Sequence, residues 1–129
     1  MKKVVLILLC VTIALLVAVG GVFAQAKLIG TWTGYAIVDN GERADFSLIL
    51  EKAEEGLTGK ITDETGMLPD MPIRNIIFQE DKLTFEFDFP SDMDFELIKI
   101  ELKLEDDTLK GFWTDSDGDS DIVDLSRKK

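Results

Sequence analysis

The sequence predicts an all-β domain, an eight-stranded antiparallel up-and-down meander closed or nearly closed into a barrel, after an N-terminal signal peptide. From residue 28 onward, apolar and polar side chains alternate in short runs. Turn residues such as Asn40-Gly41 separate these runs, and no segment has the period of a helix that could cross over the sheet. Closing such a sheet covers its apolar face and removes both exposed edges.

The eight strands are expected to follow one another through short connections, so that neighbours in the chain are neighbours in the sheet. The fifth strand is the clearest, because Leu83, Phe85, Phe87 and Phe89 alternate with polar residues, and Pro90 is expected to end it. The longest loop should span residues 63–71. The expected strands lie at residues 31–38, 45–51, 57–62, 73–79, 83–89, 98–104, 109–114 and 122–127.

Residues 1–26 are predicted to be a signal peptide, and residues 27–129 the mature barrel domain. Two lysines precede a long apolar run, and Ala24-Gln25-Ala26 has the small-x-small pattern of a cleavage site. Cleavage near Ala26 would make the protein secreted or periplasmic. The alternatives are that the apolar run is retained as a membrane anchor, or that Cys10 carries a lipid, although Cys10 lies in the middle of the run.

The composition excludes several kinds of chemistry. The chain has a net charge of −11, which opposes nucleic acid and would favour a cationic protein partner. It has no histidine, and its single cysteine lies in the predicted signal, so Ser-His-acid triads, Cys nucleophiles and the usual zinc and copper sites are excluded. We therefore expect that this protein is not an enzyme. Because the off-face strand residues are polar, we also expect no membrane insertion of the mature domain.

One motif has the residues of a metal-binding loop. Four alternating aspartates could direct carboxylate oxygens at Ca²⁺. The motif departs from an EF-hand, since its glycine is at the fourth position, no glutamate closes the loop and no helices flank it. The alternative is an acidic hairpin turn, and we expect no cofactor. The four candidate ligands are Asp115, Asp117, Asp119 and Asp121.

Residues 46–66 resemble residues 98–118 at an offset of 52 positions. This spacing would fit duplication of a four-strand unit, and it would equally fit two similar hairpins of one meander that converged on one pattern. The recurring residues are Leu50, Leu57, Gly59, Thr62, Asp63 and Gly66, which return as Leu102, Leu109, Gly111, Thr114, Asp115 and Gly118.

At Gly30-Thr31-Trp32, which opens the first strand, the sequence resembles the calycin group of lipocalins, fatty-acid-binding proteins and avidins. The resemblance implies that Trp32 lies at the closed end of the barrel, where a basic residue near the end of the last strand packs across it. Arg127 stands at that position and could stack on the indole. The alternative is that Arg127 belongs to a solvated tail together with the two final lysines. The resemblance covers only the outline of the mature chain, and no family ligand can be carried over.

The sequence is compatible with two functions. In the first, a lipocalin-like barrel is hollow and carries a small apolar ligand, with Gly34, Ala36, Gly59 and Gly111 leaving room in its interior. In the second, the interior is solid, the glycines are sharp bends, and the acidic surface binds a macromolecular partner. The candidate barrel lining is Trp32, Phe46, Leu48, Phe85, Phe87, Ile100 and Trp113.

Overall fold

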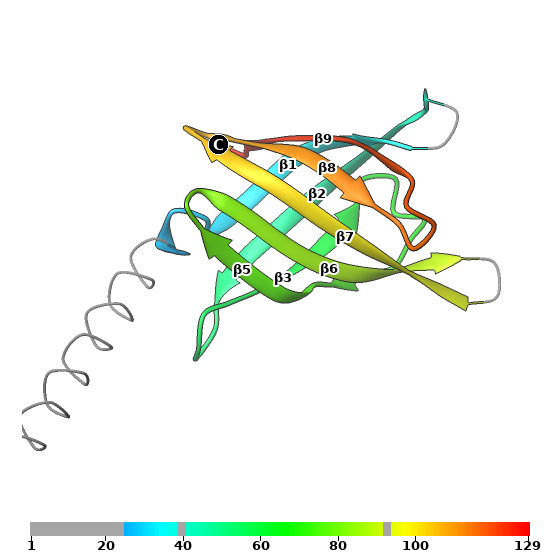
Figure 1. The fold of residues 1–129 in the computed structure, drawn as a ribbon. Helices are drawn as coiled ribbons and strands as arrows, with labels where there is room; N and C mark the ends of the chain where they lie inside the picture. Colours follow the sequence, from blue (N-terminus) through cyan, green and yellow to red (C-terminus); the bar gives the residue numbers. More distant parts are fainter. Residues whose placement is uncertain (1–24, 39–40, 92–93) are drawn as a thin grey trace, which may run out of the picture.

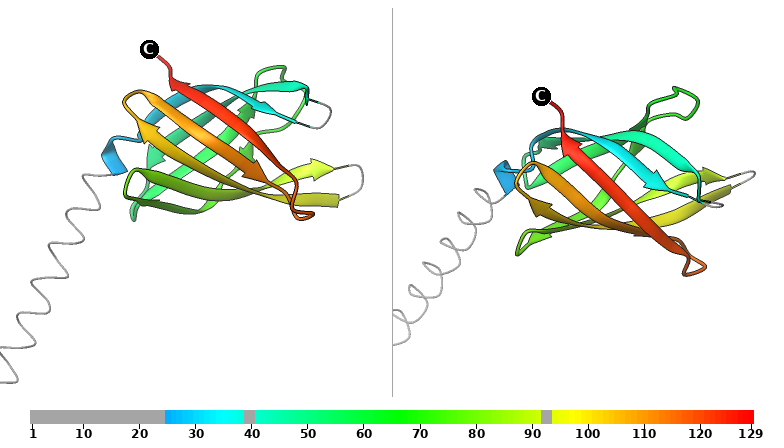
Figure 2. Two further views of the ribbon diagram at one scale, coloured as in Figure 1. Left: turned by 45° about the horizontal axis from the view of Figure 1, so that its top comes forward. Right: turned by 90° about the horizontal axis from the view of Figure 1, so that it is seen from above.

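The computed structural model describes residues 25–38, 41–91 and 94–129. They form one antiparallel sheet that curls into a nearly closed barrel, consistent with a calycin-like outline (Figure 1 and Figure 2). Most of the predicted signal lies outside the described residues, among which no helix is long and apolar enough to span a membrane. The strands are β1 (Gly30–Ile37), β2 (Arg43–Lys52), β3 (Leu57–Asp63), β4 (Met71–Pro72), β5 (Arg74–Gln79), β6 (Lys82–Ser91), β7 (Asp94–Glu105), β8 (Thr108–Thr114) and β9 (Ser120–Arg127).

The first and last strands lie side by side in the middle of the sheet. The strand order is β4-β3-β2-β1-β9-β8-β7-β6-β5, and β1 pairs with β9 from Trp32 opposite Arg127 to Ala36 opposite Val123. The two ends of the sheet are β4 and β5, which follow each other directly in the chain. The first and last strands therefore pair as the sequence predicts. Strand pairing around the barrel is interrupted between β4 and β5.

The structure corrects the expected strand count from eight to nine. The additional strand, β4, is two residues long and lies at the end of the loop expected at 63–71, with Met71 opposite Ile61 and Pro72 opposite Lys60. Two residues are too few to show an alternating pattern, and Pro72 argues against a strand in any reading of the sequence alone. The pattern therefore gave no signal for β4.

The prediction that Pro90 ends the fifth expected strand is wrong. β6 continues to Ser91, and Pro90 pairs with Phe95 of β7, which begins at Asp94 and not near residue 98. On its other side, β6 pairs with β5 only as far as Glu86. Beyond that point β6 is paired with β7 alone, so the missing N–H of proline can face the unpaired side of the strand.

The closed half of the barrel is packed solid with aliphatic side chains around one indole. As expected from the alternation, Leu83, Phe85 and Phe87 of β6 are buried. The expectation that Phe89 is buried with them is wrong, because Phe89 lies at the opposite, open end and is 36% exposed. The side chains that are less than 2% exposed are Leu28, Trp32, Leu48, Leu50, Leu83, Leu102, Leu109, Val123 and Leu125.

Trp32 and Arg127 seal this end together. The Trp32 indole is completely buried, and its Nε1–H donates to the Leu28 carbonyl at 2.9 Å. The Arg127 guanidinium lies 4.3 Å from the centre of the indole and donates from Nη1 to the Ile29 carbonyl at 3.0 Å and from Nη2 to that of Lys27. Arg127 thus holds the segment before β1 against the barrel, in the place where the resemblance puts a basic residue and not in a solvated tail.

The two similar sequence segments form hairpins of the same register. Gly59 of β3 pairs with Leu50, as Gly111 of β8 pairs with Leu102. Each hairpin is followed at the open end by a turn in which a glycine N–H donates to an aspartate carbonyl three residues earlier, at 3.1 Å in both turns. The repeated pattern therefore encodes two equivalent hairpins and two equivalent turns beside the opening of the barrel.

Candidate functional site

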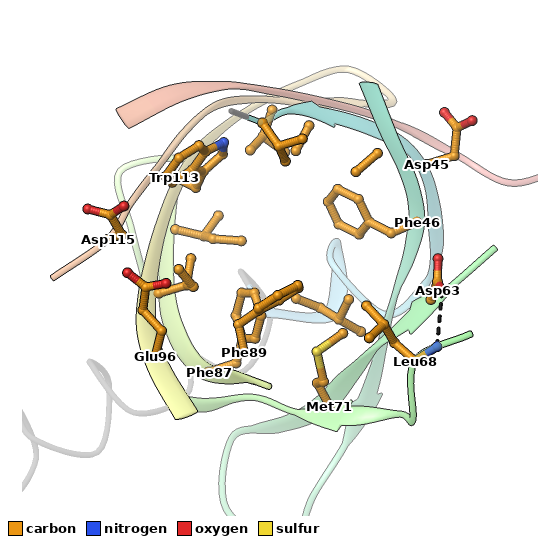
Figure 3. Close-up of a pocket in the computed structure, with 17 residues that line it drawn as sticks. Asp45, Phe46, Asp63, Leu68, Met71, Phe87, Phe89, Glu96, Trp113 and Asp115 are labelled. Carbon is orange, nitrogen blue, oxygen red and sulfur yellow. Dashed lines mark hydrogen bonds between the residues drawn. The ribbon is translucent and has the colours of Figure 1, made fainter. Parts of the chain in front are cut away.

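The open half of the barrel contains a cavity of 330 Å³ (Figure 3). It lies at the end away from Trp32, where Ala44, Asp45 and Phe89 are exposed to solvent. Most of its wall is apolar. The apolar lining residues are Ala36, Val38, Ala44, Phe46, Ile61, Leu68, Met71, Phe87, Phe89, Ile98, Ile100, Trp113 and Val123.

The predicted lining residues divide between the two halves of the barrel. Four of them, Phe46, Phe87, Ile100 and Trp113, line the cavity. The other three lie in the packed core and do not reach the cavity, namely Trp32, Leu48 and Phe85. Strand alternation correctly indicates which side chains point inward, but it carries no information on how far along the barrel the interior is filled.

Two further lining residues, Leu68 and Met71, come from the segment that the sequence pattern presents as a loop. Met71 is buried, and the Leu68 side chain turns toward the cavity beside Phe46 and Met71 (Figure 3). The only signal for them is that they are apolar residues in an otherwise polar loop. That signal is weak because exposed apolar residues are common in loops, as Met67 shows with 84% exposure.

Three of the small interior residues serve strand packing. A Cβ atom on Gly34 would lie 1.9 Å from the Asp124 carbonyl oxygen, and one on Gly111 would lie 1.9 Å from that of Glu101. At Gly59 the corresponding distance, to the Ile49 carbonyl, is 2.5 Å. These glycines let neighbouring backbones approach closely, as bends in a small barrel require. Of the four small residues, Ala36 is the one that faces the cavity.

Trp113 forms a fixed part of the cavity wall. Its Nε1–H donates to the Ile37 carbonyl at 2.7 Å, which ties β8 to the end of β1 across the intervening β9. Because its indole donor is already satisfied by the backbone, the side chain presents its ring to the cavity and offers no hydrogen bond to a ligand.

Four carboxylates stand among the cavity residues, and two of them are engaged in local structure. Asp45 forms an ion pair with Arg43, with 2.7 Å between Oδ1 and Nε. Asp63 accepts hydrogen bonds from the Thr65 hydroxyl at 2.5 Å and from the Leu68 N–H at 3.2 Å. The Thr65 hydroxyl, assisted by backbone N–H groups, holds the pKa of Asp63 below its usual value. Asp63 thereby orders the loop that brings Leu68 to the cavity.

The other two carboxylates, Glu96 and Asp115, lie next to each other at the opening, on the side of the barrel that carries Trp113 (Figure 3). Oxygen atoms of Glu96, Asp115 and Asp117 lie within 4.8 Å of one another. Asp115 Oδ1 also accepts the N–H groups of Asp117 at 3.0 Å and Asp119 at 2.9 Å, which shapes the β8–β9 turn.

The expected set of four aspartates is therefore not the set that the fold brings together. Asp115 and Asp117 belong to the carboxylate cluster, whereas Asp119 and Asp121 do not. Asp121 instead accepts the N–H of Ile122 at 2.8 Å. Glu96 joins the cluster from β7, and only the pairing of β7 with β8 reveals this, because the two segments are distant in the sequence.

Adding millimolar Ca²⁺ is expected to leave the melting temperature of the protein unchanged. One oxygen from each of three carboxylates converges, whereas Ca²⁺ takes six to eight oxygen ligands, and Asp115 Oδ1 already accepts two backbone N–H groups. The measurement is a thermal melt with Ca²⁺ and with a chelator. A clear stabilisation by Ca²⁺ that disappears in Asp117→Asn would contradict this expectation.

The fold and the cavity define the class of protein as a small, nearly closed antiparallel β-barrel, sealed at one end and hollow at the other. No protein-family model matches the sequence, and no curated protein matches it significantly. The function of the chain therefore has to be inferred from the cavity itself.

Proposed function

We propose that this protein is a non-enzymatic, lipocalin-like binding protein that carries a small apolar ligand in the open half of its barrel. The observation that carries the proposal is the 330 Å³ cavity with its largely apolar wall. Binding sites for small molecules are concave, mostly apolar and about 300–1,000 Å³ in volume, which places this cavity among those for compact ligands.

The construction of the barrel supports the same proposal. The packed half around Trp32 supplies a stable base, and Arg127 fastens the segment before β1 across that end. The core therefore does not need the open half to be filled in order to be well packed. The Gly30-x-Trp32 pattern, with Arg127 over the indole, is the arrangement that the calycin resemblance implies.

A binding role also fits the chemistry available in the cavity. Its polar groups are carboxylates, and two of these, Asp45 and Asp63, are held by Arg43 and by Thr65. The other two, Glu96 and Asp115, lie beside each other at the opening, and the chain has no histidine that could act with them as a general base. A solid barrel that acts only through its acidic surface would leave the cavity unused.

The proposal predicts saturable, one-to-one binding of a neutral apolar dye such as N-phenylnaphthylamine, with increased dye fluorescence. Ala36→Phe should weaken this binding at least about tenfold, because the new ring would occupy the cavity. Ala44→Phe is a second cavity-filling substitution. Ala44 pairs with Ala36 on the neighbouring strand and is more exposed to solvent than Ala36. Fluorescence titration measures the affinities.

Ile122→Phe is the matched control, because Ile122 is 51% exposed and is not among the cavity residues. It should leave dye binding unchanged. Thermal melts of all three variants would establish that they fold. Absence of saturable dye binding by the wild-type protein, or equal binding by both cavity-filling variants and wild type, would refute the carrier function.

A further inference from the structure

We propose that the ligand carried in this cavity is a hydrophobic cation, such as an alkyl amine, with its tail in the barrel and its positive charge between Glu96 and Asp115. This inference rests on the proposed function and specifies the chemical class of ligand. It combines an apolar cavity with charged lining residues that are all acidic.

The carboxylates and the apolar wall belong to one continuous site. Glu96 and Asp115 line the same cavity as Phe87 and Trp113, and Figure 3 shows the two carboxylates next to each other at its edge, on the side that carries Trp113. Both are partly shielded from solvent, which strengthens their interaction with a nearby charge relative to exposed groups. A molecule whose tail fills the cavity would place its outer end beside these oxygens.

The charged side chains that line the cavity are all carboxylates, and Arg43 at the same end of the barrel is paired with Asp45 and not with Glu96 or Asp115. No lysine or arginine is among the cavity residues within the described ranges, and none of the ion pairs there includes Glu96 or Asp115. An anionic head such as that of a fatty acid would meet like charges. A cationic head would relieve the repulsion between two adjacent carboxylates.

Trp113 adds a second, independent preference for a cation. Its indole Nε1–H is bound to the Ile37 carbonyl, so the ring is held in place as part of the wall. The face of a fixed indole attracts ammonium groups through its quadrupole. Carboxylates next to an aromatic face form a site for organic cations. For Ca²⁺ the match is poorer, because one oxygen from each of three carboxylates converges and Asp115 Oδ1 already accepts two backbone N–H groups.

The test compares three ligands that share one tail: octylammonium, octanol and octanoate, titrated by calorimetry or by displacement of the neutral dye. Octylammonium should bind about tenfold more tightly than octanol, and octanoate more weakly than both. Added salt should reduce the advantage of octylammonium without weakening octanol binding.

The charge-removing variants are Glu96→Gln alone and Glu96→Gln combined with Asp115→Asn, in which asparagine keeps an oxygen that can accept the turn N–H groups. Both should bring octylammonium close to octanol in affinity while octanol binding is retained. The matched control is Glu54→Gln with Glu55→Gln, which removes two exposed charges from the β2–β3 turn at the closed end. It should keep the preference for octylammonium.

The outcomes separate this inference from the carrier function. If octanol binds and octylammonium binds no more tightly, the cavity is a neutral apolar site and the inference is wrong. An equal loss of the preference in the control would assign the effect to net charge and would also overturn it. If none of the three ligands binds, the carrier function itself fails, and the preference for a cation fails with it.

Discussion

Replacing Trp32 with alanine is expected to lower the free energy of unfolding by about 3–5 kcal/mol, the range for truncation of a large buried aromatic side chain. The indole is completely buried and contacts both the segment before β1 and the end of β9, through the Leu28 carbonyl and the Arg127 guanidinium. Its loss would leave a cavity at the centre of the closed end. Urea denaturation, with the slope compared between variants, measures the change.

Phe112→Ala is the control for this prediction, because Phe112 is an aromatic residue of β8 that is 44% exposed. It should change stability by less than about 1 kcal/mol. A double-mutant cycle of Trp32→Ala with Arg127→Ala should show a coupling of about 0.5–2 kcal/mol, as a cation on an indole face would give. A loss below about 1 kcal/mol for Trp32→Ala would be inconsistent with a sealed core at this end.

Replacing Gly34 with alanine is expected to destabilise the protein by about 3 kcal/mol, at the upper end of the range for overpacking. The added methyl group would lie 1.9 Å from the Asp124 carbonyl oxygen and 2.9 Å from Leu125 Cα. Both are backbone atoms of β9, which is held between β1 and β8 and cannot move aside without loss of ladder hydrogen bonds. Gly111→Ala in β8 should destabilise the protein for the same reason, because its methyl group would lie 1.9 Å from the Glu101 carbonyl oxygen of β7.

The comparison for these substitutions is Gly118→Asn in the β8–β9 turn. Gly118 has φ of +88°, a conformation that asparagine tolerates better than most residues, and no atom lies within 4 Å of its added Cβ. The free energy of unfolding of the Gly118→Asn variant should stay within about 1 kcal/mol of that of the wild type. If Gly34→Ala were as mild as Gly118→Asn, the close approach of β1 and β9 would not be a feature of the folded protein.

The barrel architecture was accessible from the sequence because its signals are local. The alternation around Phe85 and Phe87 requires only neighbouring residues. Asn40 of the expected Asn40-Gly41 turn lies outside the described residues. Closure between the first and last strands followed from counting strands in a sequential meander. The extra strand at Met71–Pro72 and the passage of β6 through Pro90 were not accessible, because each depends on which side of a strand lacks a partner.

The candidate site was predictable only in part. The inward-facing residues were identified, but the boundary between the packed core around Leu48 and Phe85 and the cavity around Phe87 depends on side-chain volumes in three dimensions. The partner of Asp115 was not identified either. Glu96 reaches it across a strand pair, whereas the sequence emphasised the aspartates adjacent to it in the chain.

The pairing of β1 with β9 also determines when this chain can fold. Strands formed early in synthesis can make hairpins, but the middle of the ladder is complete only when residues Ser120–Arg127 become available. Contacts between the two ends of a chain form slowly, because the entropy of closing the long intervening loop is lost before the contact stabilises it. Until β9 has been made, the polypeptide is an unfinished sheet that a narrow channel can still accept. This timing would suit the export that the predicted signal peptide implies, because an exported chain would cross a membrane before it folds.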